Sequence, residues 1–214
     1  MSTLRVNNLE SYTPGNPLNI NDELQMTGST ATGAKSVAFG EDAHSIGEKS
    51  SVLGGKGNEA SASFSAIVGG STNIIKSGSK RSAILGGGNN VVHASGIDFF
   101  QEGLGAIVGG SGNQSYGNYT TIVGGQLNYT YGFGDVALGG RENIISGGRA
   151  TVIGGQSNRV SGSYAIGAGA DNKFEGDHSW GHGYQNTIKA SYASAHGRAS
   201  QVSSSAEYSH TFGS

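Results

Sequence analysis

Short apolar runs recur along the middle of the chain, and each ends just before a Gly-Gly pair. Six of them close with two adjacent aliphatic residues, namely Ile67-Val68, Ile84-Leu85, Ile107-Val108, Ile122-Val123, Ala137-Leu138 and Val152-Ile153. Neighbouring residues of a strand point to opposite faces of its sheet, and parallel sheets covered on both faces have such continuous apolar runs. The pattern therefore predicts strands with one face inside a coil and the other against a second chain.

The Gly-Gly pairs open a repeated Gly-Gly-x-x-Asn sequence with a nearly constant period. Its first glycines, 15, 17, 23, 15, 15 and 15 residues apart, are Gly54, Gly69, Gly86, Gly109, Gly124, Gly139 and Gly154. Beyond Asn158 the period becomes 14. A fixed period of this length is typical of a solenoid, in which each coil buries its apolar face against the next. We predict an all-β, parallel β-solenoid with coils of 14–15 residues.

Composition supports the repeat and excludes several classes of function. Glycine accounts for 39 of 214 residues and apolar residues for only 35%, so an ordinary globular core is not expected. A net charge of −2 without charge blocks argues against nucleic acid as a partner. There is no cysteine. No signal sequence and no apolar run long enough to span a bilayer is present, so we expect synthesis in a cytoplasm and no membrane insertion.

Three regions follow from these patterns. Residues 1–28 lie outside the repeat, hold both prolines and suit a docking or capping segment. Residues 29–200 form the repeat domain, with insertions near 76–81 and 91–105, and residues 201–214 form the C-terminal end or tip. Insertions in a solenoid map to loops along one edge, often the binding edge.

Residues 31–47, which include Ser36-Val37-Ala38-Phe39-Gly40, and a second copy at 163–170 resemble the YadA-like head repeat of trimeric autotransporter adhesins. The likeness extends over roughly residues 31–200, although Gly-Gly replaces the family's Ile-Gly between these copies. The resemblance implies a left-handed parallel β-roll that assembles as a homotrimer.

The setting of such a roll is a separate question. Bacterial surface adhesins of this type carry an export signal, a coiled-coil stalk and a membrane barrel, and none of these is found here. The opening, Ser2-Thr3-Leu4-Arg5-Val6, resembles the start of many phage tail-fibre proteins. We therefore expect a virion fibre, tail fibre or short spike, that attaches to the particle through residues 1–28 and contacts a host surface glycan or protein. The alternatives are a head-decorating fibre without a dedicated receptor, a bacterial adhesin head and a polysaccharide-degrading spike.

The repeated asparagine has a structural and a ligand-binding interpretation. The structural one is an amide ladder that joins adjacent coils at a corner, because Asn tolerates the left-handed conformation and caps backbone groups. Its members are Asn58, Asn73, Asn90, Asn113, Asn128, Asn143 and Asn158. We prefer the ladder.

Aromatic residues supply the candidate receptor contacts, because amphipathic rings dominate recognition surfaces. Phe99 and Phe100 lie in the longer insertion, where contact with a neighbouring subunit is an equal alternative. The C-terminal candidates are Trp180, Tyr184, Tyr192 and Tyr208.

His182, His196 and His210 recur every 14 residues and are predicted to stack. In a trimer they could ring the axis and hold a transition metal, although a polar histidine ladder is the preferred interpretation. We expect no cofactor otherwise. No local nucleophile motif or carboxylate pair is evident, so we expect no enzymatic activity.

Overall fold

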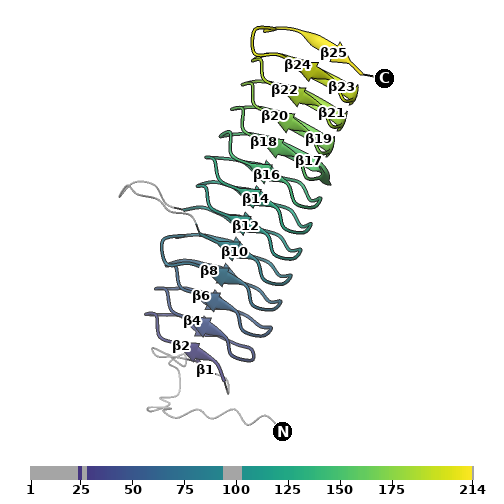
Figure 1. The fold of residues 1–214 in the computed structure, drawn as a ribbon. Helices are drawn as coiled ribbons and strands as arrows, with labels where there is room; N and C mark the ends of the chain where they lie inside the picture. Colours follow the sequence, from purple (N-terminus) through teal and green to yellow (C-terminus); the bar gives the residue numbers. More distant parts are fainter. Residues whose placement is uncertain (1–23, 26–27, 94–102, 214) are drawn as a thin grey trace, which may run out of the picture.

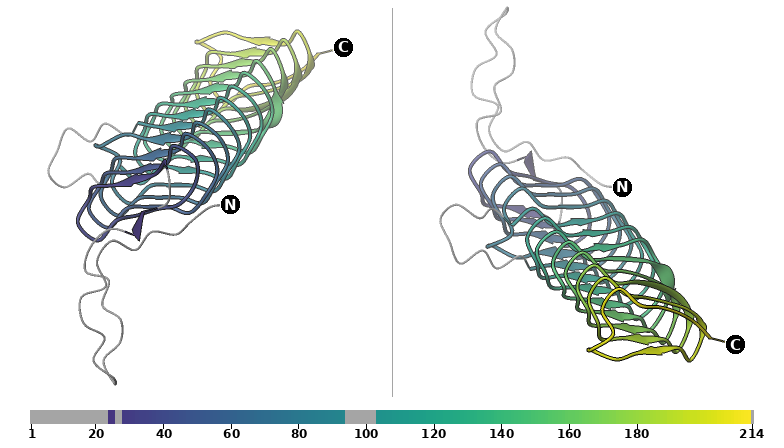
Figure 2. Two further views of the ribbon diagram at one scale, coloured as in Figure 1. Left: turned by 90° about the horizontal axis from the view of Figure 1, so that it is seen from below. Right: turned by 90° about the horizontal axis from the view of Figure 1, so that it is seen from above.

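The computed structural model describes residues 24–25, 28–93 and 103–213, which form a parallel β-solenoid of about 12 turns without a helix. Figure 1 shows the coils stacked in one rod, with β1 near one end and β25 at the other. Figure 2 shows the same rod from two further directions. The predicted all-β repeat with coils of about 15 residues is confirmed.

The strands alternate between two sheets in which every pairing is parallel. The 13-stranded sheet contains the odd-numbered strands, β1 (Leu24–Gln25), β3 (Val37–Ala38), β5 (Ser51–Val52), β7 (Ala66–Ile67), β9 (Ala83–Ile84), β11 (Ala106–Ile107), β13 (Thr121–Ile122), β15 (Val136–Ala137), β17 (Thr151–Gln156), β19 (Ile166–Ala170), β21 (Trp180–Tyr184), β23 (Ser194–Arg198) and β25 (His210–Phe212). The 12-stranded sheet contains the even-numbered strands, β2 (Thr30–Ala31), β4 (His44–Ser45), β6 (Glu59–Ala60), β8 (Ile74–Ile75), β10 (Val91–Val92), β12 (Gln114–Ser115), β14 (Tyr129–Thr130), β16 (Ile144–Ile145), β18 (Arg159–Val160), β20 (Lys173–Phe174), β22 (Thr187–Ile188) and β24 (Gln201–Val202).

Two turns close each coil. The turn at the end of an odd-numbered strand, which contains Gly-Gly-x-x-Asn in seven coils, for example residues 139–143, is called here the glycine corner. The turn after an even-numbered strand, for example residues 146–149, is called the aromatic corner because rings stack along part of it. Both insertions, after β8 and after β10, fall at the aromatic corner. Residues 94–102 of the longer insertion lie outside the described part.

The core is a narrow double column of aliphatic side chains. In most two-residue strands the second residue points inward, as Ile67 and Ile75 do from opposite sheets with no exposed surface. The first residue faces outward, and so does the residue that follows an odd-numbered strand. Val68 is consequently 49% exposed, which confirms that the adjacent aliphatic residues divide between the interior and the outer face.

The pairing register gives the coil lengths. Ile144 pairs with Arg159 fifteen residues on, whereas Arg159 pairs with Lys173 only fourteen residues on, so the predicted change of period is confirmed. Beyond residue 200, in the segment predicted to be the C-terminal end or tip, β24 and β25 continue the same two sheets. Of the proposed docking segment, residues 1–23 and 26–27 lie outside the described residues.

The C-terminal 14-residue coils start at the point where one large side chain, that of Phe174, enters the core. Phe174 is fully buried from the even-numbered sheet and faces Gly167 and Gly181 of the other sheet. A Cβ atom at either glycine would lie 2.8 Å from the phenyl ring, well inside contact distance. The ring therefore occupies the space that Val152 and its equivalents fill in earlier coils.

Candidate functional site

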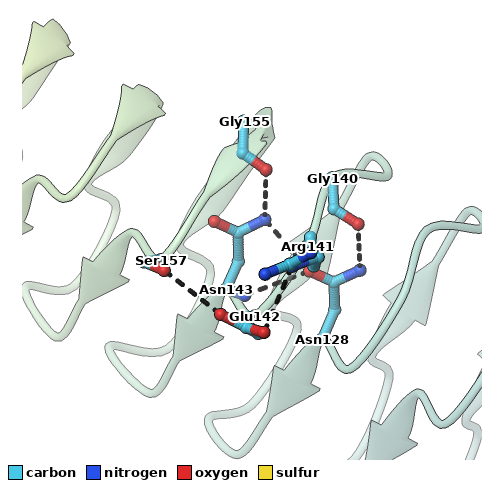
Figure 3. Close-up of polar contacts among 7 residues, drawn as sticks. All are labelled: Asn128, Gly140, Arg141, Glu142, Asn143, Gly155 and Ser157. Atoms are coloured by element: carbon cyan, nitrogen blue, oxygen red, sulfur yellow. Dashed lines mark hydrogen bonds and ion pairs between the residues drawn. The ribbon is translucent and has the colours of Figure 1, made fainter.

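The repeated asparagines line the inside of the glycine corner. Each donates to backbone carbonyls, as Asn128 Nδ2 does to Gly140 O at 3.0 Å, and each Oδ1 accepts from the next coil, as Asn128 Oδ1 does from Asn143 N at 3.2 Å (Figure 3). Beyond the seven repeats the ladder continues through Asn172 and Asn186, which the Gly-Gly signature had not marked. All of its members are buried, namely Asn58, Asn73, Asn90, Asn113, Asn128, Asn143, Asn158, Asn172 and Asn186. Their amide groups are occupied by the fold itself, so the ladder offers nothing to a ligand.

The outside of the glycine corner is polar and solvated. Glu142 lies 3.1 Å from Arg141 and accepts a hydrogen bond from Ser157 Oγ at 3.4 Å (Figure 3). Lys56 and Glu41 form a similar exposed pair at 2.7 Å. Exposed ion pairs contribute little to stability because water screens them. This corner is best described as a hydrated edge.

The outer face of the odd-numbered sheet is apolar along its middle. Seven aliphatic side chains follow successive odd-numbered strands or lie within β17, and each is about half exposed: Leu53, Val68, Leu85, Val108, Val123, Leu138 and Ile153. The strand residues two positions earlier are small or β-branched and half-buried, namely Ser51, Ala66, Ala83, Ala106, Thr121, Val136 and Thr151. This aliphatic face is one continuous surface, because main-chain hydrogen bonds keep its members in register. Long apolar faces of this kind mark interaction surfaces.

Rings stack along the aromatic corner towards the C-terminal end. Tyr164, His178, Tyr192 and Tyr208 succeed one another with ring centroids 5.0, 4.7 and 5.2 Å apart and planes within 15° of parallel. All four have φ between 55° and 58°, a left-handed conformation that recurs at the same position in most of the described coils. Because each ring covers its neighbour's face, the ladder presents mainly edges and hydroxyl groups to solvent.

The ladder begins at Tyr164, and a hollow opens in the coil before it. Arg149 takes the ring position, its guanidinium 5.5 Å from the centroid of Phe133 and 5.4 Å from that of Tyr164, and it donates a hydrogen bond to the Tyr164 hydroxyl. Gly148 stands where the adjacent coils have Phe133 and Ser163. The open hollow of about 380 Å³ is lined by Phe133, Gly148, Arg149, Ser163 and Tyr164.

A buried carboxylate holds this corner from inside the coil. Asp135 Oδ1 accepts from Gly148 N at 2.9 Å and from Ala150 N at 3.0 Å, while Oδ2 accepts from Gly132 N at 2.7 Å. Burial raises the pKa of Asp135, and the three N–H bonds oppose that rise because they favour the charged form. Among the described residues it is the only fully buried acidic side chain.

The candidate receptor contacts do not form one patch. Tyr192 and Tyr208 belong to the ring ladder, with Tyr208 68% exposed at its end. Trp180 lies on the outer face of the odd-numbered sheet, and Tyr184 lies at the glycine corner, 5.6 Å under the guanidinium of Arg198. Phe99 and Phe100 fall outside the described residues.

The pairing register contradicts the predicted stack of three histidines. His182 pairs with His196, but His196 pairs with Phe212, because the last coil is two residues longer and brings His210 opposite Ser194. The three histidines still form one chain of contacts: His182 Nδ1 lies 2.9 Å from His196 Nδ1, and His196 Nε2 lies 3.2 Å from Ser194 Oγ, which is 2.7 Å from His210 Nδ1. Within the described part of this single chain, no three potential ligands come together to hold a metal ion.

Sequence reasoning also missed an aromatic patch on the even-numbered sheet. Tyr116 and Tyr131 stack at 4.9 Å with planes 4° apart, and Tyr129 and His93 lie beside them. Burial is the main cause that raises the pKa of Tyr131, with Tyr116 and Tyr129 adding to it. The segment Asn128-Tyr129-Thr130-Tyr131 could have predicted this patch. Alternate residues of a strand share one face of the sheet, so both tyrosines lie on the outer face.

Comparison with models of known protein families finds no match, and no curated protein matches the chain. The fold and the surfaces described above are therefore the observations on which a function has to rest.

Proposed function

We propose that this chain is the subunit of a homotrimeric structural fibre or adhesin of a phage virion, which contacts the host-cell surface. The observation that carries the proposal is the aliphatic face, half exposed over seven successive coils. Covering the exposed half of each aliphatic side chain would contribute about 1 kcal/mol per residue. A single coil would gain little from this, but seven in register would stabilise an assembly strongly.

Copies of the same chain are the partners that fit this face best. A partner must offer apolar side chains at the stacking distance of parallel strands, about 4.8 Å, over the same length. A second copy in parallel orientation meets that requirement with the same residues. The number three comes from the resemblance to the trimeric adhesin head, and so does the virion or cell-surface setting.

The surfaces left outside such an assembly would be those that meet a host. The aromatic corner precedes each odd-numbered strand, whereas the residues of the aliphatic face lie at the end of the strand, next to the glycine corner. The aromatic corner carries exposed rings from Phe133 to Tyr208. Attachment through residues 1–28 belongs to the same proposal. Weak contacts to glycans would be multiplied by valency in a trimer and again on a particle.

Native mass by light scattering tests the assembly. We expect a mass of three times 21.7 kDa for the wild-type chain and a smaller species for the double variant Leu85→Glu and Val108→Glu. The matched control is Ser146→Glu, which adds a charge at an exposed position beyond β16 and should leave the trimer intact. A monomeric wild-type chain, or dissociation caused equally by the control, would contradict the proposal.

Adhesion is tested by retention of the purified wild-type chain on immobilised bacterial surface polysaccharides. We expect retention by the trimer and loss of retention by the dissociated double variant. A trimer that binds none of these polysaccharides and no bacterial cells would leave a structural fibre without a receptor, contrary to the proposal.

A further inference from the structure

We propose that the hollow at Arg149 binds an acidic sugar, a pyranose that carries a carboxylate, within a polysaccharide of the host surface. The inference rests on the proposed function and deepens it by naming the class of surface molecule. It is drawn from a coil in which a cation takes the ring position, between two aromatic rings and beside an open hollow.

The charge of Arg149 is available to a ligand. No carboxylate among the described residues lies within ion-pair distance of its guanidinium, and its one hydrogen bond goes to the Tyr164 hydroxyl. An arginine has five N–H donors and pairs with a carboxylate through two of them at once. The flanking rings of Phe133 and Tyr164, whose centroids lie 5.5 and 5.4 Å from the guanidinium carbon, restrict the side chain. A carboxylate of the ligand would thus meet a cation that is already held in place.

The backbone around the hollow is held by a buried carboxylate, that of Asp135. Burying a carboxylate is unfavourable unless it is fully hydrogen-bonded, and Asp135 occupies a position that is Thr120 one coil earlier and Ala150 one coil later. Its bonds to the N–H groups of Gly148 and Ala150 hold the backbone on both sides of Arg149. Asp135 is therefore a positioning residue for the hollow.

The rest of the lining suits a sugar ring. Phe133 and Tyr164 are 44% and 46% exposed and offer apolar surface for the ring's C–H groups. Ser163 also lines the hollow, and its backbone N–H is held by Asp177 Oδ1 at 2.7 Å. Asp177 is acidic, so this side favours hydroxyl donors over a second anion. The ligand would place its carboxylate at Arg149 and its hydroxyls towards Ser163.

The test is calorimetric titration of the wild-type trimer with methyl β-D-glucuronide, methyl β-D-glucoside and acetate. We expect binding of the glucuronide, at least about tenfold weaker binding of both other probes, and about tenfold weaker glucuronide binding by Arg149→Gln, the loss expected when a charged hydrogen bond is removed. The matched control Arg141→Gln removes an arginine at the glycine corner and should bind as the wild type does. Gly148→Asn, which tolerates a positive φ, should fill the hollow and weaken binding similarly.

Several results would overturn the inference. Equal binding of the neutral glucoside would refute the charge requirement, and equal binding of acetate would reduce the hollow to an anion site. Absence of glucuronide binding, or equal loss in the Arg141→Gln control, would also refute it. Light scattering on the same samples separates these outcomes from failure of the trimer itself.

Discussion

The middle of the rod and its C-terminal end are built on the same two corners but differ by one residue per coil. In the middle, a two-residue strand such as β15 is followed by Gly-Gly and then by an isolated bridge, for example Arg141 with Gln156. At the C-terminal end, β19 and β21 run unbroken over five residues. The two patterns meet at β17, where the register shifts between Ile153 and Gln156.

The comparison assigns different roles to the two glycines of each pair. The first one is the added residue, a bulge that breaks the strand. The second one is kept in both regions, as Gly155 in the middle and Gly169 at the end, and it packs its backbone against the next coil. The longer coil thus gains one residue without losing the contact that stacks the rod.

The largest expected effect separates the two glycines within one pair. Gly70 has a φ of 89°, and a Cβ there would lie 2.1 Å from the carbonyl oxygen of Gly87, whereas a Cβ at Gly69 would meet nothing within 4 Å. Gly70→Ala should lower the free energy of unfolding by about 3 kcal/mol through overpacking and backbone strain. Gly69→Ala should change it by less than about 1 kcal/mol. Guanidinium unfolding of both variants is the measurement, and equal losses would refute the division of roles.

A smaller effect is expected when the added glycine is removed. Deleting Gly139 turns a 15-residue coil into a 14-residue coil that resembles Phe39-Gly40-Glu41 near the start of the repeat, where Val37 pairs with Ser51 fourteen residues on. The deletion should cost less than about 1 kcal/mol. Deleting Ile122 from β13 instead should prevent folding, because it moves the strand's side chains to the wrong face. Circular dichroism and guanidinium unfolding distinguish the two, and an unfolded Gly139 deletion would contradict the bulge assignment.

Much of the fold could be predicted because its signal is local and repeated. The pairing of Ile67 inside with Val68 outside follows from strand alternation, and the change of period follows from the spacing of the motif. The sites were less predictable. His210 was misplaced because matching histidine to histidine ignores the longer final turn, which the polar run Ser203-Ser204-Ser205 signals.

The Arg149 hollow could not be predicted from spacing alone. It depends on which corner residue has a positive φ and on which neighbours then stack, and neither is encoded in the apolar pattern. Association with a second chain was predicted from the alternation of apolar residues along the strands, and the number three from the family resemblance, and both stay predictions.

The smallest expected effect concerns the histidines that replace the aliphatic face at the C-terminal end. Ile153 is succeeded in its column by Ala168, His182, His196 and Phe212. His196 is only 8% exposed, and its pKa is lowered mainly by burial and further by His182 and His210. Its folded pKa thus lies below the unfolded value of about 6.5.

The unfolded chain binds the proton more readily, so stability should be full above about pH 6.5 and should fall as the pH drops below that value. Thermal unfolding between pH 8 and pH 5 should show this decline in the wild-type chain and a shallower one in His196→Gln. An NMR titration of the ring protons reads the pKa directly. A wild-type His196 that titrates at or above about 6.5 would show that the C-terminal end tolerates charge on this face, and the contrast with the aliphatic middle would then be one of shape alone.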